Sequence, residues 1–240
     1  MTSDDGFRFR YDPAIVAAFP AVRGGVIHTT GVANGSSPQA LATAFRAEQE
    51  AVRARIGETP LSELPSIAAW RRAFRTFGAD PTHYRSAAEA LLRRLTKQGS
   101  IPSINTVVDI GNLVSIRHAL PAAMFDLRTA TGGTTVRFAA GDEAFTDLGS
   151  GERQVPETGE VIFVDEAGLV SARRWCWRQS AESASTEATT DLLVTVEAQH
   201  VGGADAVESA LADLESLLRA HAAPSALNSG LVNASSPTFG

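Results

Sequence analysis

Two segments of the sequence place single polar side chains among apolar ones, where a ligand could be bound. Asp109 and Asn112 lie three positions apart in an apolar stretch, so they share one face of a helix. Glu197 follows the apolar and threonine run Leu192–Val196. Strand alternation puts Glu197 on the same face as Thr195. An amide and a carboxylate placed in this way can hydrogen-bond a small polar molecule.

Each of these polar residues also has a purely structural interpretation. Asp109 is expected to be structural. Asn112 either satisfies neighbouring backbone groups, as most buried polar side chains do, or projects into a cavity. Glu197 is either a strand-end carboxylate in solvent or a buried acceptor. A buried acceptor selects ligands that carry a donor, because leaving it unpaired costs about 1–3 kcal/mol.

Basic and aromatic residues alternate in the segment Arg173–Arg178. Arg174, Trp175 and Arg178 suit stacking on nucleic-acid bases combined with phosphate contacts. They equally suit a strand whose tryptophans are core and whose arginines are solvated. Arg85, just before the helix expected at Ser86–Gln98, belongs to the same candidate nucleic-acid surface.

Other common chemistries have no pattern in the sequence. The five histidines show no ligand spacing with one another or with Cys176, so no metal site is predicted. No nucleophile elbow, phosphate-binding loop or dinucleotide motif occurs, so no cofactor is expected. Cys176, the one cysteine, is interpreted as a small buried residue that forms no disulfide.

The composition is that of a globular protein, with 44% apolar and 20% charged residues among 240. The net charge of −6 argues against binding nucleic acid over a wide surface, so any such contact should be local. There is no signal-peptide pattern and no apolar run of the roughly 18 residues that span a membrane. A cytoplasmic location is therefore expected, and a single cysteine suits it.

Periodicity predicts helices followed by strands. Expected helices cover Pro38–Ile56, Ser66–Phe77, Ser86–Gln98, Asn105–His118 and Asp205–Ala220. Expected strands cover Thr134–Ala139, Glu143–Leu148, Val161–Asp165, Leu169–Trp175 and Leu192–Ala198. Val22–Thr30 also has strand character, which Gly24 and Gly25 weaken. This order predicts a mixed α+β fold of the broad α/β kind, without a doubly wound parallel sheet.

One region carries a family resemblance. The segment INTVVDIGNLVSIRHALPAAMFDL, residues Ile104–Leu127, is similar to the B3/B4 tRNA-editing module of the phenylalanyl-tRNA synthetase beta subunit. Val136–Phe138, Glu143–Gly149 and Val164–Glu166 follow in the family's order, and LLVTVEA at Leu192–Ala198 closes the match. The resemblance covers about half of the chain.

The resemblance implies a three-layer domain with a β-sandwich of unusual topology. We expect this B3/B4-like module to occupy residues 83–222. Residues 1–82 are then an N-terminal arm and helical section packed on the module. Residues 223–240, rich in small polar residues, are expected to form a poorly ordered tail.

The resemblance also implies a substrate pocket. In the family the module hydrolyses tyrosine wrongly attached to phenylalanine tRNA. Asn112 matches the pocket asparagine, and Glu197 matches the glutamate that recognises the tyrosine hydroxyl. Ala123 stands where the family has a histidine, and the bulky segment 174–178 replaces its paired glycines. The pocket is therefore expected to persist with a rebuilt wall.

The implied function is editing in trans by an aminoacyl-tRNA deacylase. Asn112 would orient the ester or the ribose at the aminoacylated 3′ end of tRNA, and Glu197 would recognise the amino-acid side chain. Arg85, Arg174, Trp175 and Arg178 would contact the tRNA. The alternative is a non-catalytic module that binds tRNA or an amino acid, and a purely structural protein would lack the cavity. The amino acid, the tRNA and the oligomeric state stay open.

Overall fold

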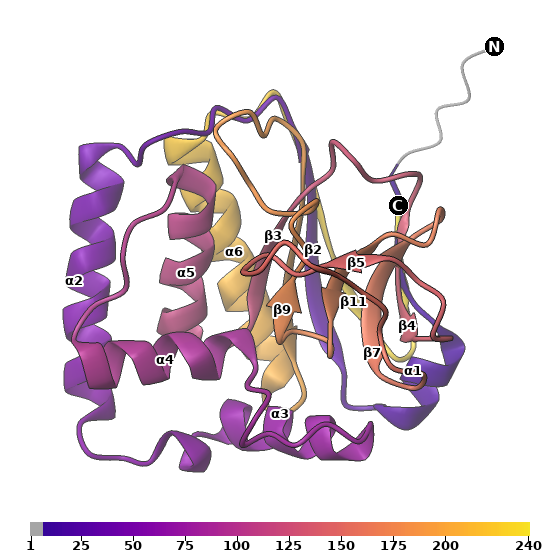
Figure 1. Ribbon diagram of the computed structural model, residues 1–240. Helices are drawn as coiled ribbons and strands as arrows, with labels where there is room; N and C mark the ends of the chain where they lie inside the picture. The colour runs from indigo at the N-terminus through magenta and orange to yellow at the C-terminus, as the bar shows by residue number, and fades with distance from the viewer. Residues whose placement is uncertain (1–6) are drawn as a thin grey trace.

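A computed structural model describes residues 7–240; residues 1–6, at the start of the predicted arm, lie outside the described part. The fold is mixed α+β, as predicted. Figure 1 shows three layers: helices on the left, a four-stranded sheet in the middle and a six-stranded sheet on the right. Within residues 7–240 no helix is both long and apolar enough to cross a membrane.

The helical layer begins and ends close to the residues that the periodicity predicts. Ser86 caps one helix through a hydrogen bond to the Glu89 amide, and left-handed Gly99 ends that helix. Asn105 caps the next by accepting from the Val108 amide. The helices are α1 (Pro13–Ala18), α2 (Gln39–Ile56), α3 (Pro65–Thr76), α4 (Ala87–Gln98), α5 (Thr106–His118) and α6 (Gly203–His221), with a 3-10 turn, η1, at Leu61–Glu63.

The middle sheet is antiparallel and carries the core on both of its faces. Its strands, in order, are β11 (Ala226–Asn233), β2 (Arg23–Thr30), β10 (Leu192–Ala198) and β3 (Ala122–Asp126). Val194 and Val196 of β10 pack against the helices, and Leu193 packs against the other sheet. The predicted alternation is confirmed, and it turns Glu197 toward the second sheet.

The outer sheet is mixed, because β1 pairs with β4 in parallel while the other strands are antiparallel. Its strands, in order, are β12 (Thr238–Phe239), β1 (Phe9–Tyr11), β4 (Thr134–Phe138), β7 (Val161–Asp165), β8 (Val170–Arg173) and β9 (Arg178–Gln179). A small hairpin, β5 (Phe145–Thr146) with β6 (Arg153–Gln154), lies beside it. The predicted strand at Glu143–Leu148 is thus reduced to two residues.

The C-terminal segment is ordered, so the predicted tail is wrong. Residues 226–233 form β11, which pairs with β2 over eight residues, and β12 then pairs with β1. Its best-buried side chain is Val232, and Leu227 is partly buried against the helical core. The strand also contains Asn, Ser and Gly, and main-chain hydrogen bonds to β2 run along its whole length.

The N-terminal section supplies strands as well as helices. β2 lies between β11 and β10, and β1 lies between β12 and β4. Gly24 is required in β2 because a Cβ there would lie 2.5 Å from the Tyr11 hydroxyl and 2.8 Å from Cγ2 of Val232. This part of the chain is therefore built into both sheets.

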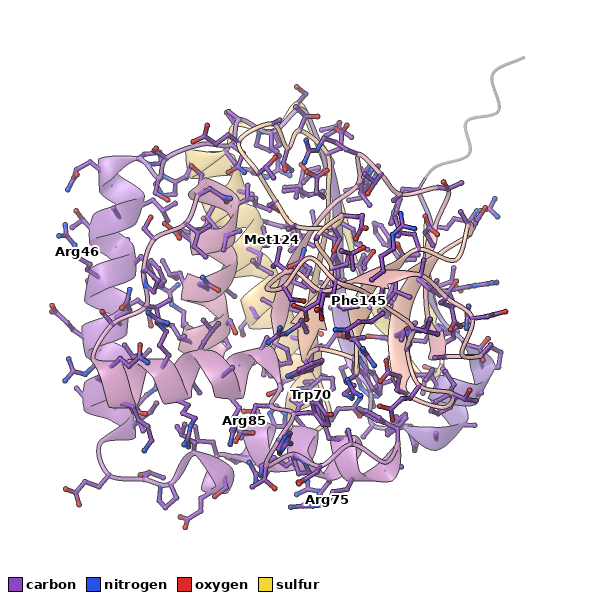
Figure 2. All side chains as sticks on the ribbon, viewed as in Figure 1. Arg46, Trp70, Arg75, Arg85, Met124 and Phe145 are labelled. Atoms are coloured by element: carbon purple, nitrogen blue, oxygen red, sulfur yellow. The ribbon has the colours of Figure 1, made fainter. Side chains whose placement is uncertain are left out.

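An aromatic cluster joins α3 to the outer sheet. Trp70 lies fully buried between them, with its ring centroid 5.2 Å from that of Trp175 (Figure 2). Phe19 also packs edge-on against Trp175, with ring centroids 4.9 Å apart. Trp70 and Phe74 of α3 are thus core, and the packing of Trp70 and Phe19 fixes the position of Trp175.

Candidate functional site

A pocket opens where the edges of the two sheets meet helix α5. β3 is the last strand of the middle sheet and β9 the last strand of the outer one. The pocket has an empty volume of about 640 Å³, which includes space at its mouth. The space for the centres of water-sized molecules is about 120 Å³, below the roughly 300–1,000 Å³ of sites for drug-sized ligands, so the pocket suits a small group. Asn112, Glu197, Trp175 and Arg178 line it together.

Helix α5 brings Asn112 to one wall of the pocket. The helix lies close to β3 because Gly111 has no side chain; a Cβ there would be 2.8 Å from Cγ of Met124. Asn112 is half-buried, and its side-chain amide makes no hydrogen bond to any residue of the described chain. If this side chain only satisfied neighbouring backbone groups, it would be hydrogen-bonded to them. Its donor and acceptor are therefore available to a ligand.

Asp109, on the same face of α5, has a different environment. Its carboxylate accepts hydrogen bonds from the Ser37 hydroxyl at 2.6 Å, from the Ser103 hydroxyl and from the Ile104 amide at 2.9 Å. These bonds tie two loops to the first turn of α5. Asp109 is fully buried and does not line the pocket, in keeping with the structural role expected for it.

Glu197 forms the floor of the pocket. The Tyr11 hydroxyl donates to Oε1 at 2.6 Å, and the Trp175 indole Nε1–H donates to the same oxygen at 3.0 Å. Glu197 is 2% exposed, so the solvent interpretation does not hold. Both donors reach Oε1, so Oε2 is the atom left for a ligand.

Burial controls protonation at this floor. It raises the pKa of Glu197 to about 7, although the hydrogen bonds from Tyr11 and Trp175 pull that pKa down. Burial, followed by the nearby Glu197 charge, raises the pKa of Tyr11 well above its usual value. The same two causes raise the pKa of Cys176, another lining residue. The phenol and thiol are thus neutral, and Glu197 changes protonation near neutral pH.

Two of the four residues expected to contact nucleic acid are buried. Arg174 pairs with Glu157 at 2.8 Å and Glu160 at 3.3 Å, and its guanidinium lies 4.0 Å from the Tyr84 ring centroid. Trp175 has no exposed surface. The interpretation of these two as a surface that stacks on bases is therefore wrong.

A tight turn is the physical reason. β8 ends at Arg173, and Arg174 and Trp175 then adopt φ values of 45° and 61° before β9 begins. These left-handed residues turn the chain, so the predicted strand at Leu169–Trp175 stops early. The turn directs Trp175 into the core, where its Nε1–H reaches Glu197.

The other two arginines remain accessible in different places. Arg178 lines the pocket, pairs with Asp147 at 2.8 Å and lies 4.8 Å from the Trp177 ring centroid. The Arg85 side chain is 29% exposed and lies outside this pocket, 3.9 Å from Glu89. Of these two arginines, Arg178 shares the pocket with Asn112, Glu197 and Trp175, and Arg85 does not.

The sequence does not predict Tyr11 as a site residue. It lies 186 positions before Glu197, and β1 brings it there through its pairing with β4. Ala123, where the family has a histidine, also lines the pocket. Across residues 7–240, no three His, Cys, Asp or Glu residues converge in a way that could hold a metal ion. What the pocket offers is binding through an amide, a buried carboxylate and aromatic walls.

The fold and the site define an α+β domain with a pocket between its layers. The model of the B3/4 domain family matches residues 69–204, more than half of the chain, so this protein belongs to the B3/4 domain family.

Similar proteins include phenylalanine--tRNA ligase beta subunits. That of Shewanella oneidensis is 30% identical over 103 residues, which are 43% of this chain and 13% of the relative. That of Aquifex aeolicus is 41% identical over 75 residues, 31% of this chain and 10% of the relative. The chain therefore corresponds to only a small part of these relatives.

Similar solved structures include an N-terminal fragment of the phenylalanyl-tRNA synthetase beta subunit from Pyrococcus horikoshii. The match has a TM-score of 0.42 and 12% identity, and it covers 86% of this chain and 48% of the fragment.

Proposed function

We propose that this protein is an aminoacyl-tRNA deacylase that edits in trans, hydrolysing the ester of a misacylated tRNA at its 3′ end. Its partner is then the aminoacylated end of tRNA, and its place of action is the cytoplasm. Membership of the B3/4 domain family and the names of the related ligase subunits support a tRNA-linked role. The amino acid removed is not part of the proposal.

One observation carries the proposal: the unbonded amide of Asn112 and the buried carboxylate of Glu197 line the same pocket. They lie 85 positions apart in sequence and come from different elements. The free amide is placed to hold the ester carbonyl or a ribose hydroxyl. The carboxylate is placed to bind a donor on the amino-acid side chain, through the oxygen that Tyr11 and Trp175 leave open.

The reaction requires little from the protein beyond positioning. A water oxygen attacks the ester carbonyl, the bond from that carbon to the ribose oxygen breaks, and the ribose oxygen takes up a proton. Free amino acid and deacylated tRNA leave. Holding water and ester in a near-attack arrangement accounts for large accelerations without a protein nucleophile. The neutral thiol of Cys176 is accordingly not used as one.

A specific observation favours the alternative of a module that binds without hydrolysis. Oε1 of Glu197 is already occupied by two internal donors, and Ala123 offers no side-chain polar group at the pocket. A site of this kind can bind an amino acid or tRNA end and leave the ester intact. Hydrolysis of misacylated tRNA by the purified protein separates the two functions.

The test is a deacylation panel of tRNAs carrying different amino acids. Wild-type protein is expected to release one amino acid or a few related ones well above the spontaneous rate. Asn112→Ala should lower the rate for every substrate. Glu197→Gln should lower the rate for the preferred substrate about tenfold or more, because hydrogen bonds to charged groups contribute about 1.5–3 kcal/mol.

Asn228→Ala is the matched control, because Asn228 is exposed on β11 and does not line the pocket. It should keep the full rate. Tight binding of aminoacyl-tRNA with no release from any substrate would establish the non-catalytic module. Equal rates for Asn112→Ala and Asn228→Ala would remove Asn112 from the mechanism.

A further inference from the structure

Positive charge is concentrated in one segment of this acidic protein. Between Pro65 and Gln98 there are seven Lys or Arg residues and two acidic ones, whereas the whole chain has a net charge of −6. The segment comprises α3, α4 and the turn that joins them. Charges of one sign gathered on two neighbouring helices create a local field that the net charge conceals.

Part of this segment lines a groove. Arg71 of α3, Arg85 of the turn, and Arg93 and Lys97 of α4 border a depression with an empty volume of about 850 Å³. We call these four residues the basic groove. Its other polar walls are mainly hydroxyl groups, and its acidic members are Glu58 and Glu89. Cations interspersed with hydroxyl donors suit phosphate oxygens.

Two of the four cations share one carboxylate, and the other two have no acidic partner among the described residues. Arg71 pairs with Glu89 at 2.6 Å, and Arg85 lies 3.9 Å from the same carboxylate. Arg93 and Lys97 are exposed and make no ion pair with any residue of the described chain. They are four positions apart, so they lie on the same side of α4. The Glu89 pairs thus shape the groove, while Arg93 and Lys97 leave it charged.

The basic groove lies next to the candidate pocket. Arg85 borders the groove, and Ala87, two residues later, lines the pocket. Their Cα atoms are at most about 7 Å apart along the chain. The Tyr84 ring centroid is 4.9 Å from that of Trp177, which also lines the pocket. Figure 2 shows Arg85 between α4 and α3.

We propose that the basic groove binds the phosphate backbone of the RNA whose 3′ end enters the pocket. The inference rests on the proposed function and adds where the RNA is held. The docking surface is then α4 and the turn before it, with Arg93 and Lys97 as the main phosphate contacts. Charge complementarity selects a polyanion, and the adjacent pocket selects one with a small group at its end.

The test measures binding of a fluorescently labelled deacylated tRNA by anisotropy, over about 50–300 mM salt. Arg93→Ala/Lys97→Ala should weaken binding roughly tenfold near 100 mM salt and reduce the salt slope by about two, one per lost phosphate contact. Both residues are exposed on a helix, and alanine favours helix, so the fold should persist. Circular dichroism melting checks this.

The matched control is Arg46→Ala/Arg94→Ala, which removes the same charge outside the groove. Arg94 is the exposed neighbour of Arg93 on α4, and Arg46 points away from the molecule on α2 (Figure 2). This pair should keep most of the affinity. Equal losses for the two double variants, or no tRNA binding by wild-type protein, would overturn the groove.

A second measurement separates this inference from the proposed function. Hydrolysis of a minimal ester, aminoacyl-adenosine, should be the same in wild type and in Arg93→Ala/Lys97→Ala. Hydrolysis of the ester without tRNA binding would contradict RNA binding by the basic groove but not the deacylase activity. Binding of tRNA that depends on the groove, without any hydrolysis, would contradict the deacylase activity but not the groove. Displacement of tRNA by poly-glutamate as effectively as by unlabelled tRNA would reject RNA as the occupant.

Discussion

At the scale of single residues, the floor of the pocket is a carboxylate in a place where ionisation is unfavourable. Burial raises the pKa of Glu197 from 4.5 to about 7, against the hydrogen bonds from Tyr11 and Trp175. Between these two pH values the folded protein holds a proton that the unfolded chain has lost. Stability should therefore fall as the pH rises through this window.

The first prediction concerns Glu197→Gln. A folded-state pKa raised above the unfolded value gives a stabilisation that is complete below about pH 4.5 and lost above about pH 7. The difference corresponds to about 3 kcal/mol. Gln keeps an oxygen that accepts from both Tyr11 and Trp175, so the variant should match wild type near pH 4.5 and exceed its stability at pH 8. Urea unfolding at both pH values measures this.

The comparison between the two proteins removes the contributions of other groups, such as Asp213, whose pKa is lowered by His118 and Arg117 despite its burial. Those groups are present in both proteins and cancel. Parallel pH profiles for wild type and Glu197→Gln would show that the carboxylate is ionised and unstrained in the folded state.

At the scale of elements, the sequence was sufficient where periodicity extends over several turns. The helices α2 to α6 and strand β10 were predicted nearly to their ends, because caps and apolar spacing mark them. Strands β1, β6, β9 and β12 were not predicted, since two or three residues carry no period, and the five-residue β3 was also missed. β11 was missed because apolar and polar residues do not alternate along it and Asn, Ser and Gly interrupt it.

The candidate site shows the same division. Asn112 and Glu197 were identified through the family resemblance, and alternation gave the correct face of β10 for Glu197. Tyr11 could not be identified, because a contact between positions 186 apart depends on sheet topology. For Arg174 and Trp175 the sequence left a nucleic-acid surface and core tryptophans both open, because it does not reveal that both residues adopt positive φ. The core interpretation holds for Trp175, but Arg174 is buried rather than solvated.

The second prediction concerns the glycine that allows β2 to pass beneath Tyr11. In Gly24→Ala the new Cβ would lie 2.5 Å from the Tyr11 hydroxyl, the group that donates to Glu197. Tyr11 or the strand must shift, which costs about 1–3 kcal/mol as overpacking usually does. Thermal unfolding should show the loss, and binding of a substrate analogue should weaken as the floor is disturbed.

Gly35→Ala is the control for this change, because nothing lies within 4 Å of the position where its Cβ would be. It should unfold like wild type and bind the analogue normally. Equal stability of Gly24→Ala and Gly35→Ala would mean that β2 yields without cost and that Tyr11 is not locked in place.

At the scale of the whole molecule, both ends of the described chain, residues 7–240, are built into the module that they flank. β1 and β12 pair at one edge of the outer sheet, and β11 covers β2 in the middle sheet. Figure 1 shows the C-terminus beside the outer sheet, near the start of the described chain. The family match, residues 69–204, therefore omits strands of both sheets, including the one that carries Tyr11.

The last prediction follows from the pairing of the C-terminal strands with β1 and β2. A protein truncated after Ala222 lacks β11 and β12, so the backbone groups of β2 that pair with β11 become an open sheet edge. Burial of Val232 alone contributes about 1.5–3 kcal/mol, so the truncated protein should lose roughly 3 kcal/mol or more in urea unfolding. The exposed edge should also promote association, which size-exclusion chromatography detects.

Truncation after Asn233 is the matched control, because it keeps β11 and should lose less stability. If both truncated proteins unfolded at the same urea concentration as the full chain, the C-terminal strands would be additions to a module that is complete without them.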